Sequence, residues 1–150
     1  MNFYLLLLFF GLASTANLWV DLWANHLKHG LMRYGKLQTA AIISLQNGAL
    51  VAGPAGVKLT NLEGRELASH FAENKYWETK NGNVTVFGKN YEVTKYDYPD
   101  KILAKGDVDS VILAKNKMTL VIAVYNFLTT AAEAEKLVDD FVEYIRTLGY

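Results

Sequence analysis

The chain of 150 residues has no cysteine and no net charge, and both absences narrow the classes of function open to it. Without cysteine there is no disulfide, no thiol nucleophile and no sulfur-ligated zinc site. Lysine plus arginine, 15 residues, balance aspartate plus glutamate, also 15, so no overall positive field attracts the chain to nucleic acid. A partner recognised by charge must therefore be bound by a local patch.

Residues typical of catalytic and metal sites are also few. The chain has 3 histidines, of which His26 and His29 are spaced to share one face of a helix. Two histidines without a third ligand nearby are usually solvated or capping residues, and we expect that here. The serines lack the glycine-flanked context of a nucleophile, and no phosphate-binding or dinucleotide-binding glycine pattern occurs. The sequence thus predicts a protein that is not an enzyme and needs no metal or cofactor.

Acidic residues gather late in the chain, at Asp139, Asp140 and Glu143. Spaced as they are on a predicted helix, they are expected to form a solvent-exposed face rather than a site.

Residues 1–16 differ in character from the rest. Leu5–Leu12 is apolar apart from Gly11, and the small residues Ala13–Ala16 follow. This pattern fits a secretory signal peptide cleaved after Ala16, although the first four residues contain no lysine or arginine. A retained N-terminal extension explains it equally well, and the run is too short to span a bilayer as a helix. Both interpretations stay open, and the sequon Asn83-Val84-Thr85 would be used only by a secreted chain.

From residue 17 to residue 150 the chain is predicted to be one domain, without linker or repeat. Apolar residues at helical spacing between Leu18 and Leu31 predict an amphipathic helix. Thr39–Leu45 is rich in β-branched residues and precedes Asn47-Gly48, which favours a two-residue hairpin turn into Ala49–Ala52.

A short helix and a run of strands follow. The capping box Thr60–Glu63 predicts a helix that ends near Ala72. The predicted strands, separated by short loops, are Val84–Phe87, Tyr91–Tyr96, Lys101–Ala104, Ser110–Lys115 and Thr119–Tyr125. Because Leu120–Val124 is continuously apolar, we expect the last strand to be central and covered on both faces.

The final helix has the clearest pattern. Thr130 and Glu133 form a second capping box. An apolar stripe follows, made of Ala134, Leu137, Phe141, Ile145 and Leu148. The predicted fold class is α+β: an antiparallel sheet of about six or seven strands, with the N- and C-terminal helices packed together on one face and the short helix on the other.

A set of segments carries a family resemblance. They are Trp19 with Asn25–Leu27, Thr39–Ile42 with Asn47-Gly48, Phe87-Gly88 with Tyr91–Val93, and the tail from Leu120 to Tyr150. In this order they resemble the profilins, over roughly residues 17–150, with the weakest match at Val57–Lys80 and no gap in the tail. The resemblance implies a profilin-like fold and an actin-monomer-binding protein that regulates actin polymerisation through contact surfaces.

The resemblance implies two surfaces, and the first binds actin. Its positions correspond here to Lys95, Lys105, Lys115, Thr129, Thr130, Glu135, Lys136 and Asp140. We expect those from Thr129 onward to lie on the exposed face at the start of the final helix. The three lysines stand on neighbouring strands, where they either form a positive patch for actin or phosphoinositide head groups, or only solubilise the sheet. The acidic loop Gly106–Asp109 is shorter than in the family and argues against phosphoinositides.

The second implied surface binds proline-rich peptides between the terminal helices. A polyproline II ligand is already stiff, so an aromatic groove captures it at little entropic cost. The corresponding positions are Trp19, Leu22, Val51, Tyr144 and Tyr150. Leu22 and Val51 replace two aromatic rings, and each lost ring costs about 1–2 kcal/mol, so binding is expected to be weaker by roughly ten- to a thousandfold. Trp23 is expected to belong to the core.

Three functions from different classes fit the sequence. The first is a cytoplasmic actin-monomer-binding protein of the actin cytoskeleton with a reduced proline-rich-peptide groove. The second is a secreted, profilin-shaped domain with a ligand other than actin. The third is a small α+β sensor module that binds a small molecule between sheet and helices, which the tightly apolar stripes disfavour.

Overall fold

A computed structural model describes residues 21–54, 56–73, 82–97 and 100–149 of the chain. The leader and the candidate positions Trp19 and Tyr150 lie outside the described residues. Residues 21–26 are α-helical and continue into a π-helical turn, η1 (Leu27–Leu31). The elements that follow are β1 (Thr39–Ser44), β2 (Leu50–Ala52), α3 (Asn61–Glu73), β3 (Asn83–Val86), β4 (Lys89–Asp97), β5 (Lys101–Lys105), β6 (Asp109–Lys115), β7 (Thr119–Asn126) and α4 (Ala131–Thr147).

The strands within the described residues form one antiparallel sheet of 7 strands in the order β2-β1-β7-β6-β5-β4-β3. The predicted run of consecutive antiparallel strands is confirmed as β3–β7. The expectation for the last strand is confirmed as well, because β7 lies between β1 and β6 and every residue of it except Asn126 is buried.

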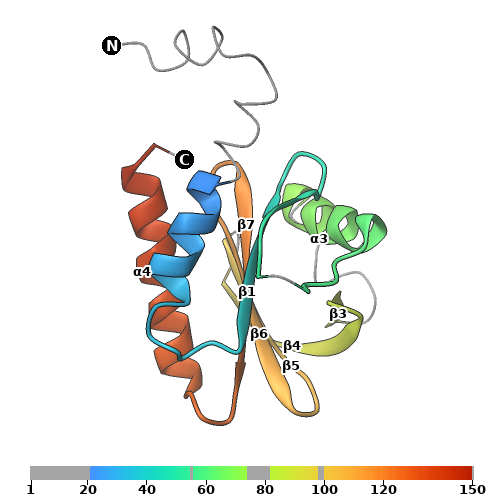
Figure 1. Ribbon diagram of the computed structural model, residues 1–150. Helices are drawn as coiled ribbons and strands as arrows, with labels where there is room; N and C mark the ends of the chain where they lie inside the picture. Colours follow the sequence, from blue (N-terminus) through green and yellow to red (C-terminus); the bar gives the residue numbers. More distant parts are fainter. Residues whose placement is uncertain (1–20, 55, 74–81, 98–99, 150) are drawn as a thin grey trace, which may run out of the picture.

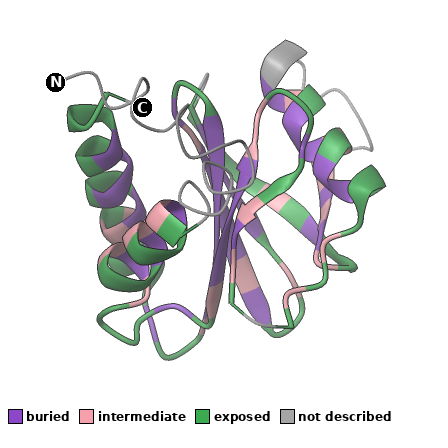
Figure 2. Cartoon of the chain, turned by 45° about the horizontal axis from the view of Figure 1, so that its top comes forward, coloured by how far each residue is buried: buried purple, intermediate pink, exposed green. Residues whose placement is uncertain are grey.

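Helices cover both faces of this sheet. In Figure 1, η1 and α4 lie side by side on one face and α3 lies on the other, as predicted. Side chains alternate along β7 between the two resulting cores. Val121 and Ala123 pack with α4, whereas Leu120 and Ile122 belong to the core under α3. Figure 2 shows the buried residues along the sheet and on the helix sides that face it.

The first hairpin differs from the prediction. Asn47-Gly48 does not form a two-residue turn. The pair of β1 and β2 residues nearest the loop is Ile43 with Leu50, so the connection is longer than two residues. A bulge separates this pair from the next one, Ile42 with Ala52. Gly48 has a φ of 73° and meets Gly64 of α3, where a Cβ on either residue would collide with the backbone of the other. This close contact between loop and helix explains the longer connection.

The first capping box is half right. The Thr60 hydroxyl accepts the Glu63 N–H at 3.1 Å and starts α3 as predicted. The Glu63 carboxylate instead accepts the N–H groups of Phe87 and Gly88, the latter at 3.1 Å. Glu63 is buried, and the two N–H groups belong to the tight turn between β3 and β4, in which Phe87 has a φ of 53°. The carboxylate thus ties α3 to this turn.

The capping box of α4 is confirmed, and its apolar stripe needs a correction. The Thr130 hydroxyl accepts the Glu133 N–H at 3.1 Å. Leu148 lies beyond the last helical turn and is 45% exposed, so it is not part of the stripe. Val138 and Val142 are buried in its place. The stripe follows the contact with the sheet, which the helix leaves at its C-terminal end.

Candidate functional site

Helix α4 has two flanks whose residues alternate along the helix. The sheet flank consists of Glu135, Asp139 and Glu143, of which Asp139 and Glu143 line a cleft with β5 and β6. The η1 flank consists of Lys136, Asp140 and Tyr144, which line a groove with the end of η1. Residues four apart share a helix face, so both sets run along α4 in parallel.

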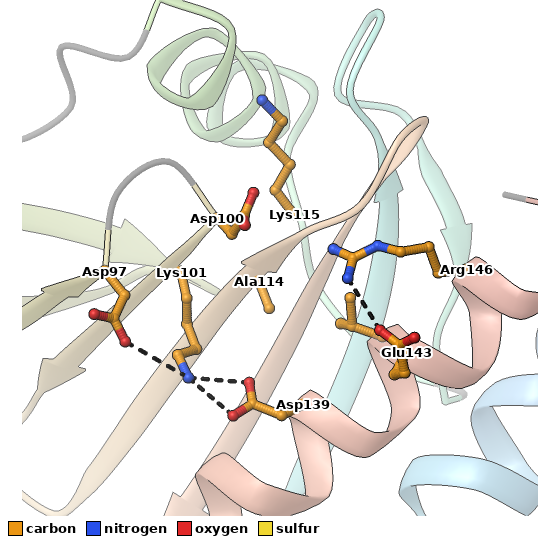
Figure 3. Close-up of a pocket in the computed structure, with 9 residues that line it drawn as sticks. Asp97, Asp100, Lys101, Ala114, Lys115, Asp139, Glu143 and Arg146 are labelled. Carbon is orange, nitrogen blue, oxygen red and sulfur yellow. Dashed lines mark hydrogen bonds and ion pairs between the residues drawn. The ribbon is translucent and has the colours of Figure 1, made fainter.

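The sheet flank is organised around Lys101 of β5. Its amine lies 2.7 Å from Glu135 and 3.0 Å from both oxygens of Asp139, and the side chain is only 11% exposed. Lys95 of β4 joins the network at 3.1 Å from Glu135. Figure 3 shows the Lys101 amine between Asp97 and Asp139. Asp139 was predicted to be part of a solvent-exposed acidic face, but it also forms an ion pair with a lysine of the sheet.

The charges of this network support one another. Burial alone would lower the pKa of Lys101, but its hydrogen bonds to Glu135 and Asp139 outweigh burial and the pKa is raised. The hydrogen bond from Lys101 holds the pKa of Glu135 below its usual value. The sequence analysis did not identify Lys101 as part of a site. The only indication in the sequence of a cation between helix and sheet was the spacing of Glu135 and Asp139, which puts both carboxylates on one helix face.

The three predicted lysines do not form a single patch. In β6, Ile112 and Ala114 belong to the core under α4, so alternation directs the Lys115 side chain toward the α3 side, although Lys115 also borders the cleft that contains Lys101 and Asp139. Lys105 pairs with Ser110 at the opposite end of β6 from Lys115. In Figure 3, Lys115 points away from Lys101 and α4.

The predicted residues around the start of α4 also separate. Thr129 is buried, contrary to expectation, and its hydroxyl donates to the Lys36 carbonyl at 2.6 Å. Thr130 is exposed and caps α4. Lys136 and Asp140 are exposed, pair with each other at 3.0 Å and lie on the η1 flank, away from Glu135.

Three exposed apolar side chains lie next to these positions and were missed. Phe127 is 89% exposed, Leu128 is 76% exposed and Val108 is 73% exposed. Asp109 pairs with Asn126, so the turn carrying Val108 lies beside the turn carrying Phe127 and Leu128. We call these three residues the loop edge. Apolar residues are normally counted as core in a sequence, and only the strand register reveals that these are not.

The turn behind the loop edge is anchored by a buried cluster. The Tyr91 hydroxyl donates to Asp109 at 2.8 Å, and the Lys89 amine lies 3.2 Å from the same carboxylate. Burial, followed by the hydrogen bond to Asp109, raises the pKa of Tyr91. Gly106 fits against the Tyr91 ring, where a Cβ would lie 2.9 Å from it. Val108 is therefore presented on a fixed turn.

The η1 flank is aromatic. Tyr34, Leu137, Phe141 and Tyr144 line a groove of about 480 Å³ between α4 and the end of η1. Tyr34 is 61% exposed and Tyr144 is 46% exposed. Gly30 allows the two helices to approach, since a Cβ there would lie 2.6 Å from the Phe141 ring. We call this space the helix groove.

Of the predicted proline-rich-peptide positions, Tyr144 borders the helix groove. Leu22 and Val51 are half-buried, and Val51 packs against the core under α4. Tyr144 also contacts His26 edge to face, with centroids 5.6 Å apart, and burial lowers the pKa of His26. Trp23 is fully buried, as expected. Tyr144 thus borders the helix groove on one side and contacts His26 on the other.

Searches within the described residues for other kinds of site gave two negative results. No group of His, Cys, Asp or Glu side chains there could hold a metal ion. No helix of that part is long and apolar enough to cross a membrane.

The sequence matches the family model named Profilin over residues 21–150. The chain belongs to the profilin family. Profilin IA of Acanthamoeba castellanii is 25% identical, with a TM-score of 0.76. Schizosaccharomyces pombe profilin is 24% identical, with a TM-score of 0.77. Mouse profilin IIa, solved in complex with a double repeat from the FH1 domain of mDia1, is 20% identical, with a TM-score of 0.65.

Each of these three matches covers 85% of this chain and 99% of the profilin compared. A search of curated proteins gave no significant match. The α+β profilin fold predicted from the sequence is confirmed. Profilins are binding proteins that contact actin and proline-rich peptides, so this family membership implies actin binding.

Proposed function

We propose that the chain binds actin monomers in the cytoplasm and regulates their polymerisation, using its profilin domain of residues 17–150. One observation carries the proposal: Phe127 and Leu128 are exposed at the start of α4, in the region where the resemblance implies actin contacts. Exposed apolar side chains grouped at one edge mark interaction surfaces. An aromatic anchor with a polar rim is the usual composition of a binding hot spot.

We assign the actin contact to the loop edge together with nearby polar residues. Lys105 ends β5 next to the Val108 turn, and Thr130 follows Leu128 directly. Lys95 and Glu135 form a charged rim whose geometry Lys101 fixes. Because the charges are already paired, the rim contributes orientation more than affinity. Of the other residues predicted for actin, Thr129 is buried, Lys115 lies at the end of β6 away from the loop edge, and Lys136 and Asp140 belong to the η1 flank.

A polymerisation assay with pyrene-labelled actin tests the proposal. The wild-type chain is expected to slow polymerisation, and the double variant Phe127→Ser, Leu128→Ser is expected to weaken the effect about tenfold or more. Met118→Ser is the control, because Met118 is a 55% exposed apolar side chain on the turn between β6 and β7, at the other end of these strands. No effect of the wild-type chain at tens of micromolar would overturn the proposal, and equal loss in the control would overturn the assignment of the surface.

The second activity that we propose is weak binding of proline-rich peptides at Tyr144. Its support is an exposed tyrosine beside η1, in a family whose mouse member has been solved with an FH1 repeat. Leu22 and Val51 carry no ring, which agrees with reduced affinity. The structure gives less support to phosphoinositide head groups, because Lys105 and Lys115 lie at opposite ends of β6.

The apolar run Leu5–Leu12 is the observation that favours the alternative function, a secreted profilin-shaped domain with a ligand other than actin. N-terminal sequencing of the native protein separates the two. A start at Met1 supports the cytoplasmic proposal. A start at Asn17 with sugar on Asn83 supports secretion and removes actin as the partner.

A further inference from the structure

An apolar groove lies between the first helix and the end of β2, apart from the surfaces discussed so far. Its described lining consists of Ala24, Leu27, Lys28, Met32, Gly53 and Pro54. We call this space the η1–β2 groove. Its volume is about 330 Å³, and because an apolar cavity of about 150 Å³ holds a benzene ring, it has room for about two large apolar side chains.

The lining of the η1–β2 groove selects for an apolar, uncharged occupant. Leu27 is buried and forms its floor, whereas Ala24 and Pro54 are exposed at its edges. Of the described residues that line it, only Lys28 is charged, and its exposed amine can stay in water while its stem covers an apolar ligand. A charged ligand would find no carboxylate in this lining and would lose its own hydration.

The first residues of the chain have the chemistry that this groove accepts. Residues 1–20 contain no charged side chain, and Leu5–Leu12 consists of leucine, phenylalanine and one glycine. Left in water, an apolar run of this size is an aggregation hazard. We propose that the leader, residues 1–16, folds back and packs Leu5–Leu12 into the η1–β2 groove of its own chain. The inference rests on the proposed cytoplasmic function, in which the leader is not cleaved.

The connection between leader and groove is short and long enough at once. Asp21 is the first described residue, and Ala24 follows it by about 4.5 Å along the helix. From Ala24 to Met32 the groove extends for roughly 12 Å. The segment between Leu12 and Asp21 spans up to about 30 Å when extended, so the apolar run reaches the whole groove even after the chain reverses direction. Ser14 and Asn17 within this segment are residue types that favour turns.

Tethering favours the leader over a ligand in solution. A short flexible link holds the apolar run at an effective concentration of about a millimolar next to the groove. A separate peptide or a second copy of the chain would need that concentration in solution to compete. The leader therefore acts as an intramolecular cover for the groove, and the groove keeps the apolar run away from water.

Disulfide trapping in the full chain tests the inference, because the chain has no cysteine of its own. The pair Leu8→Cys with Lys28→Cys is expected to close within one molecule at least about tenfold faster than the control pair, Leu8→Cys with Ser69→Cys. Ser69 is exposed on α3, which covers the other face of the sheet (Figure 1). Leu6→Cys and Phe10→Cys repeat the comparison two residues to either side. Mass spectrometry after thiol quenching measures each closure rate.

Limited proteolysis follows the leader without a cross-link. Cleavage by chymotrypsin after Phe9 and Phe10 requires the leader to leave the groove, so its rate reports the population of the open form. Ala24→Glu puts a charge into the groove and is expected to speed this cleavage about tenfold. Asn25→Glu is the matched control at the next position, exposed and outside the described lining, and should stay within about twofold of wild type. Thermal unfolding checks that each variant is folded.

The contrary outcomes are distinct. Equal closure rates for Lys28→Cys and Ser69→Cys would overturn the inference, and so would disulfides that form mainly between molecules. Protection of Phe9 and Phe10 only when phosphatidylcholine vesicles are added would show that the leader binds lipid, which also overturns it. None of these results affects the proposed actin binding, which the pyrene-actin assay measures separately. A native protein that starts at Asn17 would remove both the inference and the cytoplasmic proposal.

Discussion

The two flanks of α4 contain similar charged residues one position apart, yet the structure uses them differently. Glu135 and Asp139 reach the nearly buried amine of Lys101 on another element, whereas Lys136 and Asp140 pair with each other in solvent, with side chains 78% and 68% exposed. The first pairing joins helix to sheet, and the second stays within the helix. The comparison shows that a charged side chain on α4 joins the helix to the sheet only where a partner on a strand lies opposite it.

The largest expected effect comes from removing the cation of the sheet flank. Lys101→Met keeps the apolar stem of the side chain but leaves Asp139 without its cation and Glu135 with Lys95 alone. We expect the free energy of unfolding to fall by about 2 kcal/mol, measured by urea denaturation. The matched change on the η1 flank, Lys136→Met, should cost less than about 0.5 kcal/mol. Equal losses in the two variants would remove the distinction between the flanks.

A smaller effect is expected on the η1 flank from Gly30→Ala. The added Cβ would lie 2.6–2.7 Å from the Phe141 ring. Overpacking of this kind costs about 1–3 kcal/mol, offset by up to about 1 kcal/mol of helix propensity, so a net loss of about 1 kcal/mol is expected in thermal or urea unfolding. Adding Phe141→Leu should recover part of the loss. A Gly30→Ala variant more stable than wild type would contradict the close approach described here.

The smallest effect is the dependence on pH that Glu135 gives to the sheet flank. The pKa of Glu135 is lowered in the folded state, so its contribution to stability is complete above the unfolded pKa, about 4.3, and is lost as pH falls through the folded pKa. The stability difference between wild type and Glu135→Gln should therefore shrink from pH 7 toward pH 3 in urea titrations. A difference that does not change with pH would show that the carboxylate charge is not what stabilises the contact.

Local signals in the sequence were enough for most of the fold. Short loops separate β3–β7, and the continuous apolar run of β7 predicted its central place, because these patterns depend only on neighbouring residues. The Asn47-Gly48 turn was wrong because contact with Gly64, 16 residues later, lengthens the loop. The capping role of Glu63 was half right because the β3–β4 turn, not visible locally, takes its carboxylate.

The candidate site was less accessible to sequence reasoning. Lys101 meets Glu135 across 34 residues, and no spacing rule links them. Phe127 and Leu128 look like core residues until the strand register sets them past the end of β7. The three predicted lysines stay a prediction as actin contacts, and the strand register separates two of them: Lys105 pairs with Ser110, at the opposite end of β6 from Lys115.

Whether the two surfaces act independently is tested most directly by binding both partners at once. Sedimentation velocity of the full chain with monomeric actin and labelled decaproline follows the peptide label and actin together. The account predicts that the label sediments with a complex of chain and actin and that each partner changes the other's affinity by less than about twofold, since the loop edge and the helix groove share no residue. Displacement of the peptide by actin, or of actin by the peptide, would contradict it.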